Sequence, residues 1–271
     1  MVEEILIELL LLWSFEGGWL VSSLAPGPLL GVATFAHCFY LLNWTDGAVA
    51  LKGCPGGQIL RASYAFGKYA FLGSDGVYLV EGKDVRKLDC NCTYVLPLKN
   101  GVAACTRDGK LVTPRWTLPI SCNWLGTNGT VLFASSDNST YIIDLNDGGV
   151  LAELRAGGAA GSACGSLLAL TNASSVTVFN GTESLWTAPA NWAGEPDFSD
   201  DCKYLAYPEV YEGRLNVVEA ATGKVVLRKT FYFSEECQLT LFSVAWKGHI
   251  IALGRGDGWV EAYTVRGLEG G

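Results

Sequence analysis

The chain has 271 residues, of which 49% are hydrophobic and only 17% charged, and its formal net charge is −8. Its 19 Lys and Arg residues are scattered and outnumbered by 27 acids, so most of the surface would repel a phosphate backbone and we expect no nucleic-acid partner. The 33 glycines and 11% aromatic residues suit many short strands joined by tight turns. No low-complexity linker divides the chain, which favours one domain over residues 1–271.

The N-terminal apolar run from Ile5 to Trp13 is the one segment that resembles a targeting signal. It follows Glu3 and Glu4, contains Glu8 and has no Lys or Arg upstream, whereas a secretory signal has a positive start and an uncharged core. The run is also too short to span a bilayer. We therefore expect no transmembrane segment and interpret the run as a buried strand, with a signal remnant as the alternative.

Asp-Gly or a related turn pair recurs seven times between short apolar runs. A two-residue type I′ turn needs positive φ at both central residues, which Asn, Asp and Gly tolerate. The spacing of about 29 to about 45 residues is the range expected when each repeat is one four-stranded blade. The pattern predicts an all-β, seven-bladed β-propeller, with six blades as the alternative. The turns lie at Asp46-Gly47, Asp75-Gly76, Asp108-Gly109, Asp137-Asn138, Asn172 to Ser174, Glu212-Gly213 and Asp257-Gly258.

Each repeat should supply four antiparallel strands, a to d from the central channel outward, with the recurring turn between strands b and c. The expected b and c strands, in chain order, are 39–43 and 48–51, 69–73 and 77–80, 102–105 and 110–112, 131–135 and 140–145, 167–170 and 176–179, 203–207 and 214–219, and 249–253 and 259–265. Strands d are expected at 150–154 and 224–227 in the fourth and sixth repeats.

The last repeat lacks a fourth strand, because the chain continues from residues 259–265 directly into 266–271. An exposed apolar edge is an aggregation hazard, and propellers commonly cover it with a strand from the opposite terminus. We therefore predict that Ile5 to Leu12 pairs beside 259–265 and closes the ring. An amphipathic helix over the same residues is the alternative, since Leu, Ile and Glu also suit helices.

Nine cysteines leave at least one unpaired, and Cys90 and Cys92 are the one closely spaced pair. A single C-x-C without a second pair or a nearby His does not make a zinc site. We expect free cysteines packed as small hydrophobes, with disulfides of the kind found in secreted or hyperthermophile proteins as the alternative. The single Met favours a thermophilic, for example archaeal, source, whereas the low charged fraction argues against one. The cysteines are Cys38, Cys54, Cys90, Cys92, Cys105, Cys122, Cys164, Cys202 and Cys237.

Three segments resemble the WD40-like and quinoprotein-like β-propeller superfamily. Residues 198–207 (FSDDCKYLAY) are similar to its phrase SPDGKYLAY, residues 218–226 to its d-x-x-t-G-k-v-v phrase, and residues 72–80 to its Gly-Ser-Asp-Gly phrase. The resemblance implies a propeller over nearly the whole chain. With two His and no Trp-Asp dipeptide, the chain lacks the recurring Gly-His and Trp-Asp signatures of true WD40 repeats.

Motifs of catalysis are absent from the sequence, which has no nucleophile elbow, Walker loop or His-Glu-x-x-His segment. His37 and His249 stand at expected strand starts without a neighbouring acid or nucleophile, so we expect structural roles for both. We assign no catalytic residue, cofactor or metal ligand. A metal-dependent propeller hydrolase or lactonase would need several carboxylates converging in the channel, and remains the enzymatic alternative.

Propeller topology predicts one acidic, turn-rich face, because b–c turns and d–a connections emerge on the same side. The turns place Asp46, Asp75, Asp108, Asp137, Glu212 and Asp257 there, the connection 189–197 adds Trp192, Glu195 and Asp197, and the next connection adds Glu235 and Glu236. Asp is also favoured in such turns for backbone reasons, and Arg107, Arg214 and Arg255 offset part of the charge. We predict a non-enzymatic scaffold whose protein partner contacts Trp192, Glu195, Asp197, Asp108, Asp137 and Asp257.

Six Asn-x-Ser/Thr triplets could accept glycans if the protein were extracellular. Hairpin turns also enrich this pattern, and the N-terminus lacks a convincing export signal, so we predict a cytoplasmic protein with an extracellular glycosylated propeller as the alternative. The triplets begin at Asn43, Asn91, Asn128, Asn138, Asn172 and Asn180.

Overall fold

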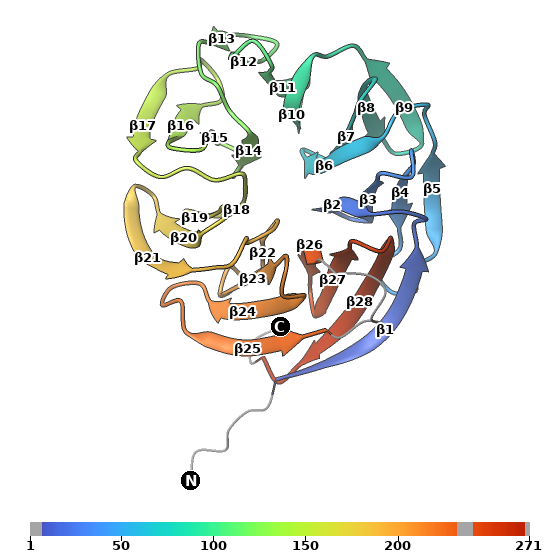
Figure 1. Cartoon of the computed structure of the whole chain (residues 1–271). Helices are drawn as coiled ribbons and strands as arrows, with labels where there is room; N and C mark the ends of the chain where they lie inside the picture. Colours follow the sequence, from blue (N-terminus) through green and yellow to red (C-terminus); the bar gives the residue numbers. More distant parts are fainter. Residues whose placement is uncertain (1–6, 232–240, 269–271) are drawn as a thin grey trace.

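The computed structural model describes residues 7–231 and 241–268, and within them every regular element is a β-strand. The strands form seven four-stranded antiparallel sheets arranged as the blades of a ring around a central channel (Figure 1). The prediction of a seven-bladed all-β propeller is therefore confirmed. In the described part of the chain no helix is long and apolar enough to cross a membrane.

In each blade the four strands run from the innermost, a, beside the channel to the outermost, d. Blade 1 is β2 (Val21–Pro26), β3 (Leu30–Thr34), β4 (Phe39–Leu42) and β5 (Val49–Gly53); blade 2 is β6 (Ile59–Ala65), β7 (Lys68–Gly73), β8 (Gly76–Glu81) and β9 (Asp84–Leu88). Blade 3 is β10 (Cys92–Leu98), β11 (Gly101–Thr106), β12 (Leu111–Val112) and β13 (Thr117–Leu118); blade 4 is β14 (Trp124–Thr127), β15 (Val131–Ser135), β16 (Thr140–Asp144) and β17 (Val150–Leu154). Blade 5 is β18 (Ala160–Cys164), β19 (Leu167–Thr171), β20 (Ser175–Asn180) and β21 (Glu183–Pro189); blade 6 is β22 (Asp197–Phe198), β23 (Tyr204–Glu209), β24 (Arg214–Glu219) and β25 (Val225–Thr230). Blade 7 is β26 (Leu241–Lys247), β27 (Ile250–Arg255), β28 (Trp259–Arg266) and β1 (Glu8–Glu16).

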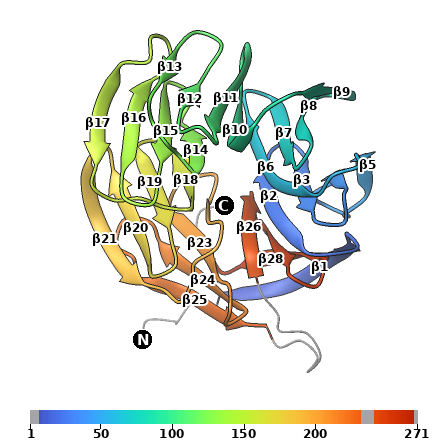
Figure 2. The ribbon, with the colours of Figure 1, turned by 45° about the horizontal axis from the view of Figure 1, so that its top comes forward.

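The hydrophobic core lies between neighbouring blades and not inside any one sheet. The middle strands are buried on both faces, as in β7, whereas outer strands such as β9 are exposed almost throughout. Phe39 of blade 1 stacks on Phe71 of blade 2 with ring centroids 4.4 Å apart, and both rings are fully buried. Figure 2, in which the top of the ring is turned forward, shows the innermost strands around the channel. Each blade is therefore stabilised by the apolar face of the next one.

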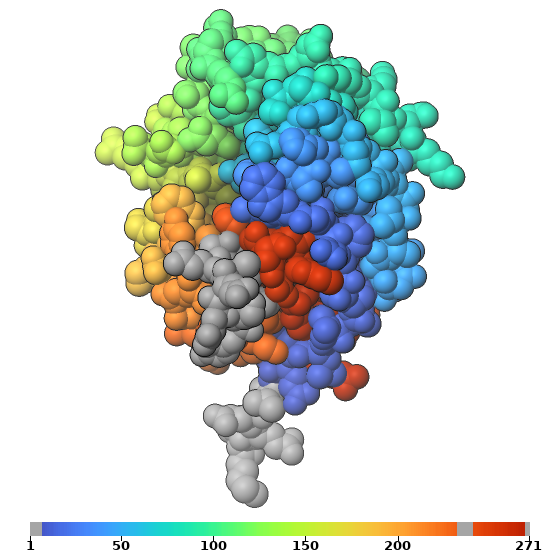
Figure 3. Space-filling model, turned by 45° about the vertical axis from the view of Figure 1, so that its right-hand side comes forward, coloured from blue at the N-terminus to red at the C-terminus, as the bar shows by residue number. Residues whose placement is uncertain are grey.

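The N-terminal strand β1 closes the ring as blade 7's outermost strand. It pairs antiparallel with β28 from Glu8 opposite Arg266 to Glu16 opposite Trp259, with an irregularity between Leu11 and Trp13. In the space-filling view the N-terminal segment lies against the C-terminal blade (Figure 3). The predicted strand and its pairing are confirmed from Glu8 to Leu12, and the helix alternative is wrong there, while Ile5 and Leu6 lie outside the described residues. The expected burial is wrong for most of the strand: as an outermost strand it buries only Leu9 and Trp13.

Three tryptophans, two in outer strands and Trp116 directly before one, dock onto the c–d turn of the following blade. In each case the indole Nε1–H donates to a turn carbonyl, and the ring covers a glycine with positive φ where a Cβ atom would come within 2.8 Å of the indole. Only glycine fits there, because the turn is left-handed and the ring lies flat against it. The docks are Trp13 onto the carbonyl of Trp44 and Gly47, Trp116 onto Leu145 and Gly148, and Trp186 onto Ala220 and Gly223, joining blades 7 and 1, 3 and 4, and 5 and 6.

In blade 1 the strands were predicted one hairpin out of place. The segments predicted as strands b and c are strands c and d, so Asp46-Gly47 occupies a c–d turn on the opposite face from the other acidic turns. The b–c turn of this blade lies between β3 and β4, where His37 has a φ of 65°. A histidine supplies the positive φ there, which is why no Asp-Gly pair marked the turn.

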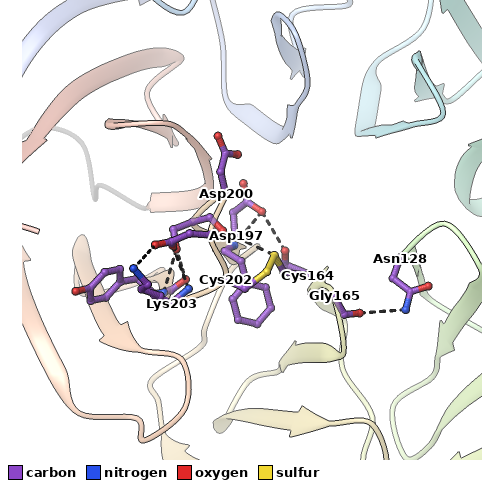
Figure 4. The surroundings of a disulfide bond; sticks show 12 residues. Asn128, Cys164, Gly165, Asp197, Asp200, Cys202 and Lys203 are labelled. Atoms are coloured by element: carbon purple, nitrogen blue, oxygen red, sulfur yellow. Dashed lines mark hydrogen bonds and ion pairs between the residues drawn. A yellow bond between two sulfur atoms is a disulfide. The ribbon is translucent and has the colours of Figure 1, made fainter. Parts of the chain in front are cut away.

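Four disulfides correct the expectation of free cysteines. They join Cys38 to Cys54, Cys90 to Cys92, Cys105 to Cys122 and Cys164 to Cys202, and Cys237 lies outside the described residues. The first three lie among the b–c turns and d–a connections. The fourth lies on the opposite face and joins blade 5 to blade 6, across 38 residues of chain (Figure 4).

Candidate functional site

We call the side of the ring that carries the b–c turns and d–a connections the bc face, and the other side the ab face. The connection from β21 to β22 places Trp192 on the bc face between two b–c turns. Its backbone N–H donates to the carbonyl of Ala173 in blade 5, and its carbonyl accepts from Val210 N–H in blade 6. The indole is 48% exposed and meets Tyr211, itself 63% exposed, edge-on with ring centroids 5.8 Å apart. The two rings form an exposed aromatic pair at the junction of blades 5 and 6.

The backbone of Trp192 is held in a conformation that bulky residues rarely adopt, with a φ of 56°. Such a conformation costs about 1–3 kcal/mol and persists only where surrounding contacts over-determine it. The two backbone hydrogen bonds to neighbouring turns supply that restraint. The protein therefore maintains strain at a position where the side chain it presents is half exposed.

A polar network fixes the surface beneath the aromatic pair. Glu209, 8% exposed, accepts from the Asn191 backbone N–H at 3.2 Å and from Arg214 Nη1 and Asn216 Nδ2, each at 3.1 Å. Arg214 also forms an ion pair with Glu212, and the amide of Asn191 donates to Glu212 at 3.3 Å. Because charge-assisted hydrogen bonds surround Glu209, the loop that carries the aromatic pair has a rigid base.

The turn acids of the bc face lie on separate blades and are mostly paired with cations. Asp108 forms an ion pair with Lys110 at 2.6 Å, which holds the pKa of Asp108 below its usual value, and Asp257 pairs with Arg255. Asp137 accepts from the amide of Asn123 at 2.8 Å. Asp75 and Glu212 pair with Lys87 and Arg214. The structure therefore spaces Asp108, Asp137 and Asp257 around blades 3, 4 and 7, and local pairing offsets much of the predicted acidity.

Glu195 and Asp197 are placed differently from the expected acidic face, because both lie in the channel. Glu195 Oε1 accepts from Arg61 Nη1 at 2.7 Å, and this ion pair joins blade 6 to blade 2 across the ring. Burial raises the pKa of Glu195, and the Arg61 charge opposes that rise. The backbone of Glu195 bonds to Phe242 and Val244, which draws this segment inward beside β26.

Asp197 is a buried carboxyl that connects the inner strands of three blades. Its Oδ1 accepts from the Ser162 hydroxyl and the Phe198 backbone N–H, each at 3.0 Å, and its Oδ2 accepts from the Trp246 N–H at 2.8 Å. Because Ser162 lies on β18 and Trp246 on β26, the Asp197 side chain bonds the short β22 to the inner strands of both neighbouring blades. Burial raises the pKa of Asp197 to about 7, and the three hydrogen bonds oppose the rise.

The channel contains a cavity of about 390 Å³ lined by inner strands of all seven blades. Most of its wall is apolar or small, with aromatic rings from Tyr64, Phe66, Tyr94 and Trp124. Among residues 7–231 and 241–268, no group of three or more His, Cys, Asp or Glu is arranged to hold a metal ion. The channel thus has an aromatic wall and two acids, of which one is neutralised by Arg61.

Comparison with known proteins identifies the fold. No protein-family model and no curated protein matches the sequence. Among solved structures, BamB from Moraxella catarrhalis superposes with a TM-score of 0.64 at 14% sequence identity, covering 96% of this chain and 88% of that one. The chain therefore shares its overall fold with that protein. At this identity the likeness concerns the fold alone.

Trp192 was predicted from the sequence, whereas its aromatic partner Tyr211 and the cross-channel Arg61 were not. Tyr211 directly precedes the Glu212-Gly213 turn, so its exposure on a hairpin tip was a usable signal. Nothing local marks Arg61, because its role arises from Glu195, which is 134 residues away. Glu235 and Glu236, predicted for the same face, lie outside the described residues.

Proposed function

We propose that the protein is a non-enzymatic interaction scaffold that binds a protein partner through the bc face, with Trp192 and Tyr211 as the anchor. The observation that carries the proposal is the half-exposed Trp192 held at a φ of 56° by two neighbouring turns. Exposed aromatic residues on a rigid base are typical of interface hot spots, because they bury a large area with little loss of conformational entropy. The seven-bladed ring supplies the rigid support for such a surface.

In this proposal the acids of the bc-face turns lie at the edge of the interface and not at its centre. Glu212 lies beside the aromatic pair, whereas Asp108, Asp137 and Asp257 lie on other blades. Charges at an interface rim contribute mainly to association rate and to salt dependence. Glu195 and Asp197 support the surface from the channel, since the connection carrying Trp192 ends in their inner strand.

The experiment is partner capture with the folded protein immobilised, comparing Trp192→Ala with the wild-type chain. Trp19→Ala is the matched control, since Trp19 is also an exposed tryptophan, at 54%, in the β1–β2 connection on the bc face. A photo-crosslinking amino acid in place of Tyr211 should then link the same partner directly. Loss of the partner with Trp192→Ala but not with Trp19→Ala supports the anchor, and equal capture by all three proteins refutes it.

We also propose that the protein works in an oxidising compartment, in place of the cytoplasmic location expected from the sequence. Four disulfides support this location, because cytosolic thiols are normally kept reduced, with hyperthermophile proteins as the exception. Five of the six glycan triplets begin at an exposed Asn, whereas Asn172 is partly buried. Thiol alkylation in intact cells, followed by mass spectrometry, should find these eight cysteines blocked, and labelling of all of them would refute the location.

A further inference from the structure

Asp197 lies on the wall shared by two cavities. The channel cavity of about 390 Å³ and a second cavity of about 490 Å³ near the ab face are both lined by Pro26, Tyr64, Ala163 and Asp197. The second cavity extends to Asp200, next to the Cys164–Cys202 disulfide (Figure 4). Asp197 thus borders both cavities, although the residue is only 9% exposed.

Asp197 is also the acid of these cavities that has no cationic partner among the described residues. The charged residues on the two walls are Glu195, Asp197, Asp200 and Lys247. Glu195 pairs with Arg61 at 2.7 Å, and Asp200 pairs with Lys247 at 3.5 Å. Asp197 instead accepts three hydrogen bonds from neutral donors, one hydroxyl and two backbone amides.

One lone-pair direction of the Asp197 carboxylate accepts no hydrogen bond from the described residues. A carboxylate offers about four lone-pair directions, and three are used here. Segments 1–6, 232–240 and 269–271 contain no Lys or Arg, so their side chains do not supply the missing charge either. When Asp197 is ionised, no described side chain supplies its counter-charge, and a bound cation would do so.

We propose that the channel cavity binds a small organic cation, an ammonium group on a short apolar body, with the ammonium on Asp197. The wall fits this chemistry, because Tyr64, Phe66, Tyr94 and Trp124 offer aromatic rings, and aromatic faces attract cations as well as apolar groups. The volume of about 390 Å³ lies in the range of small-molecule sites. The site is separate from the aromatic pair of the bc face and does not depend on the scaffold function.

The affinity should rise with pH, because the ammonium needs the ionised carboxylate. Burial raises the pKa of Asp197 to about 7, so binding strengthens as the pH increases through that value. Glu195, whose pKa burial also raises, faces the same cavity, and the paired Asp200 and Lys247 face the neighbouring one. The part of the pH dependence that is due to Asp197 is therefore the difference in hexylammonium affinity between the wild type and Asp197→Asn at each pH.

The test measures binding of hexylammonium, with hexan-1-ol and hexanoate as a neutral and an anionic probe of similar length, by titration calorimetry. Asp200→Asn is the matched control, since it removes an acid of the neighbouring cavity that already has a cationic partner. We expect hexylammonium to bind best at alkaline pH, and Asp197→Asn to weaken it about tenfold or more, as for loss of one charge-assisted hydrogen bond. Asp200→Asn should change binding less than Asp197→Asn.

Equal affinity for hexan-1-ol, or unchanged binding in Asp197→Asn, would overturn the proposal. If Asp197→Asn does not fold, Ala163→Leu provides a second variant, because Ala163 lines both cavities and the larger side chain fills them from the side. The Ala163→Leu variant should then no longer bind hexylammonium. The wild-type protein should still bind hexylammonium more tightly at alkaline pH. Retained binding in Ala163→Leu would place the ligand elsewhere and refute the site.

Discussion

The buried carboxyl of Asp197 should make the propeller less stable as the pH rises, and Asp197→Asn should remove that dependence. The folded-state pKa of about 7 lies above the value of 3.8 for an unperturbed Asp. Between these two values the folded state binds more protons than the unfolded state, so ionisation favours unfolding. Stability from this group is therefore greatest below pH 3.8 and falls until the pH passes about 7.

The size of the stability change follows from the difference between the folded-state and unfolded-state pKa of Asp197. Each pKa unit corresponds to about 1.4 kcal/mol, so the complete shift is worth about 4 kcal/mol in the free energy of unfolding. Between about pH 4.5 and about pH 8 the integrated loss is about 3 kcal/mol, because part of the titration of the unfolded chain lies below that interval. The asparagine at 197 does not titrate, and its altered hydrogen bonds add a constant that does not vary with pH.

The assay is urea unfolding of both proteins at the two pH values, followed by tryptophan fluorescence. Other groups with shifted pKa values, such as Asp75, Asp108 and Glu195, occur in both proteins and cancel in the difference between them. The stability of the wild type relative to Asp197→Asn should fall by about 3 kcal/mol from the acid to the alkaline condition. A difference that stays constant would show that Asp197 keeps one charge state throughout, which would refute the reasoning.

Three further perturbations test how the ring is held together. Cys202→Ser should lower the free energy of unfolding by about 4 kcal/mol, the chain-entropy value for the 38-residue separation of the Cys164–Cys202 disulfide, measured by urea unfolding. Trp13→Ala should cost about 3–5 kcal/mol, because the indole is buried and docks blade 7 onto blade 1, and thermal melting will show it. Arg61→Met should cost about 3 kcal/mol, because it leaves the buried Glu195 without a counter-charge, again measured in urea.

Each of these predictions has a control. Leu11→Ala on the same strand as Trp13 should cost less than about 1 kcal/mol, because Leu11 is 58% exposed, and equal losses would contradict the docking role. Adding Glu195→Leu to Arg61→Met should restore most of the stability, since an apolar pair replaces a buried ion pair at little cost. Reducing agent should abolish the difference between Cys202→Ser and the wild type, and a difference that survives reduction would contradict the cross-link as its cause.

The ring architecture was predictable because its signal is local. Six of the seven repeats carry an Asn-, Asp- or Gly-containing turn between strands b and c. In four of them the glycine has a positive φ, whereas the turns at Asp137-Asn138 and at Asn172 to Ser174 form without one. The same chemistry also suits c–d turns, and that ambiguity misplaced Asp46-Gly47 by one hairpin in blade 1. There the true b–c turn uses His37, whose sequence gives no such signal.

The candidate sites were predictable only where exposure follows from position on a turn or connection. Trp192 was recognised for that reason, whereas Glu195 and Asp197 share its connection yet turn into the channel. Both acids turn inward because β22 is short and because Arg61 of blade 2 and Ser162 of blade 5 bond to their side chains. Contacts with residues so far away in the chain leave no pattern in the nearby sequence. The disulfides were unpredictable in the same way, since their pairing depends on which turns the ring brings together.

The tryptophan docks make the seven blade junctions unequal. They secure the junctions of blades 7 and 1, 3 and 4, and 5 and 6, and the last of these also carries the inter-blade disulfide. Blade 2 takes part in none of these three docks. The seam where the two chain ends meet is thus reinforced, and under load or heat the circle should part at an undocked junction. Amide hydrogen exchange would register that opening first at one of the four undocked junctions, 1–2, 2–3, 4–5 or 6–7.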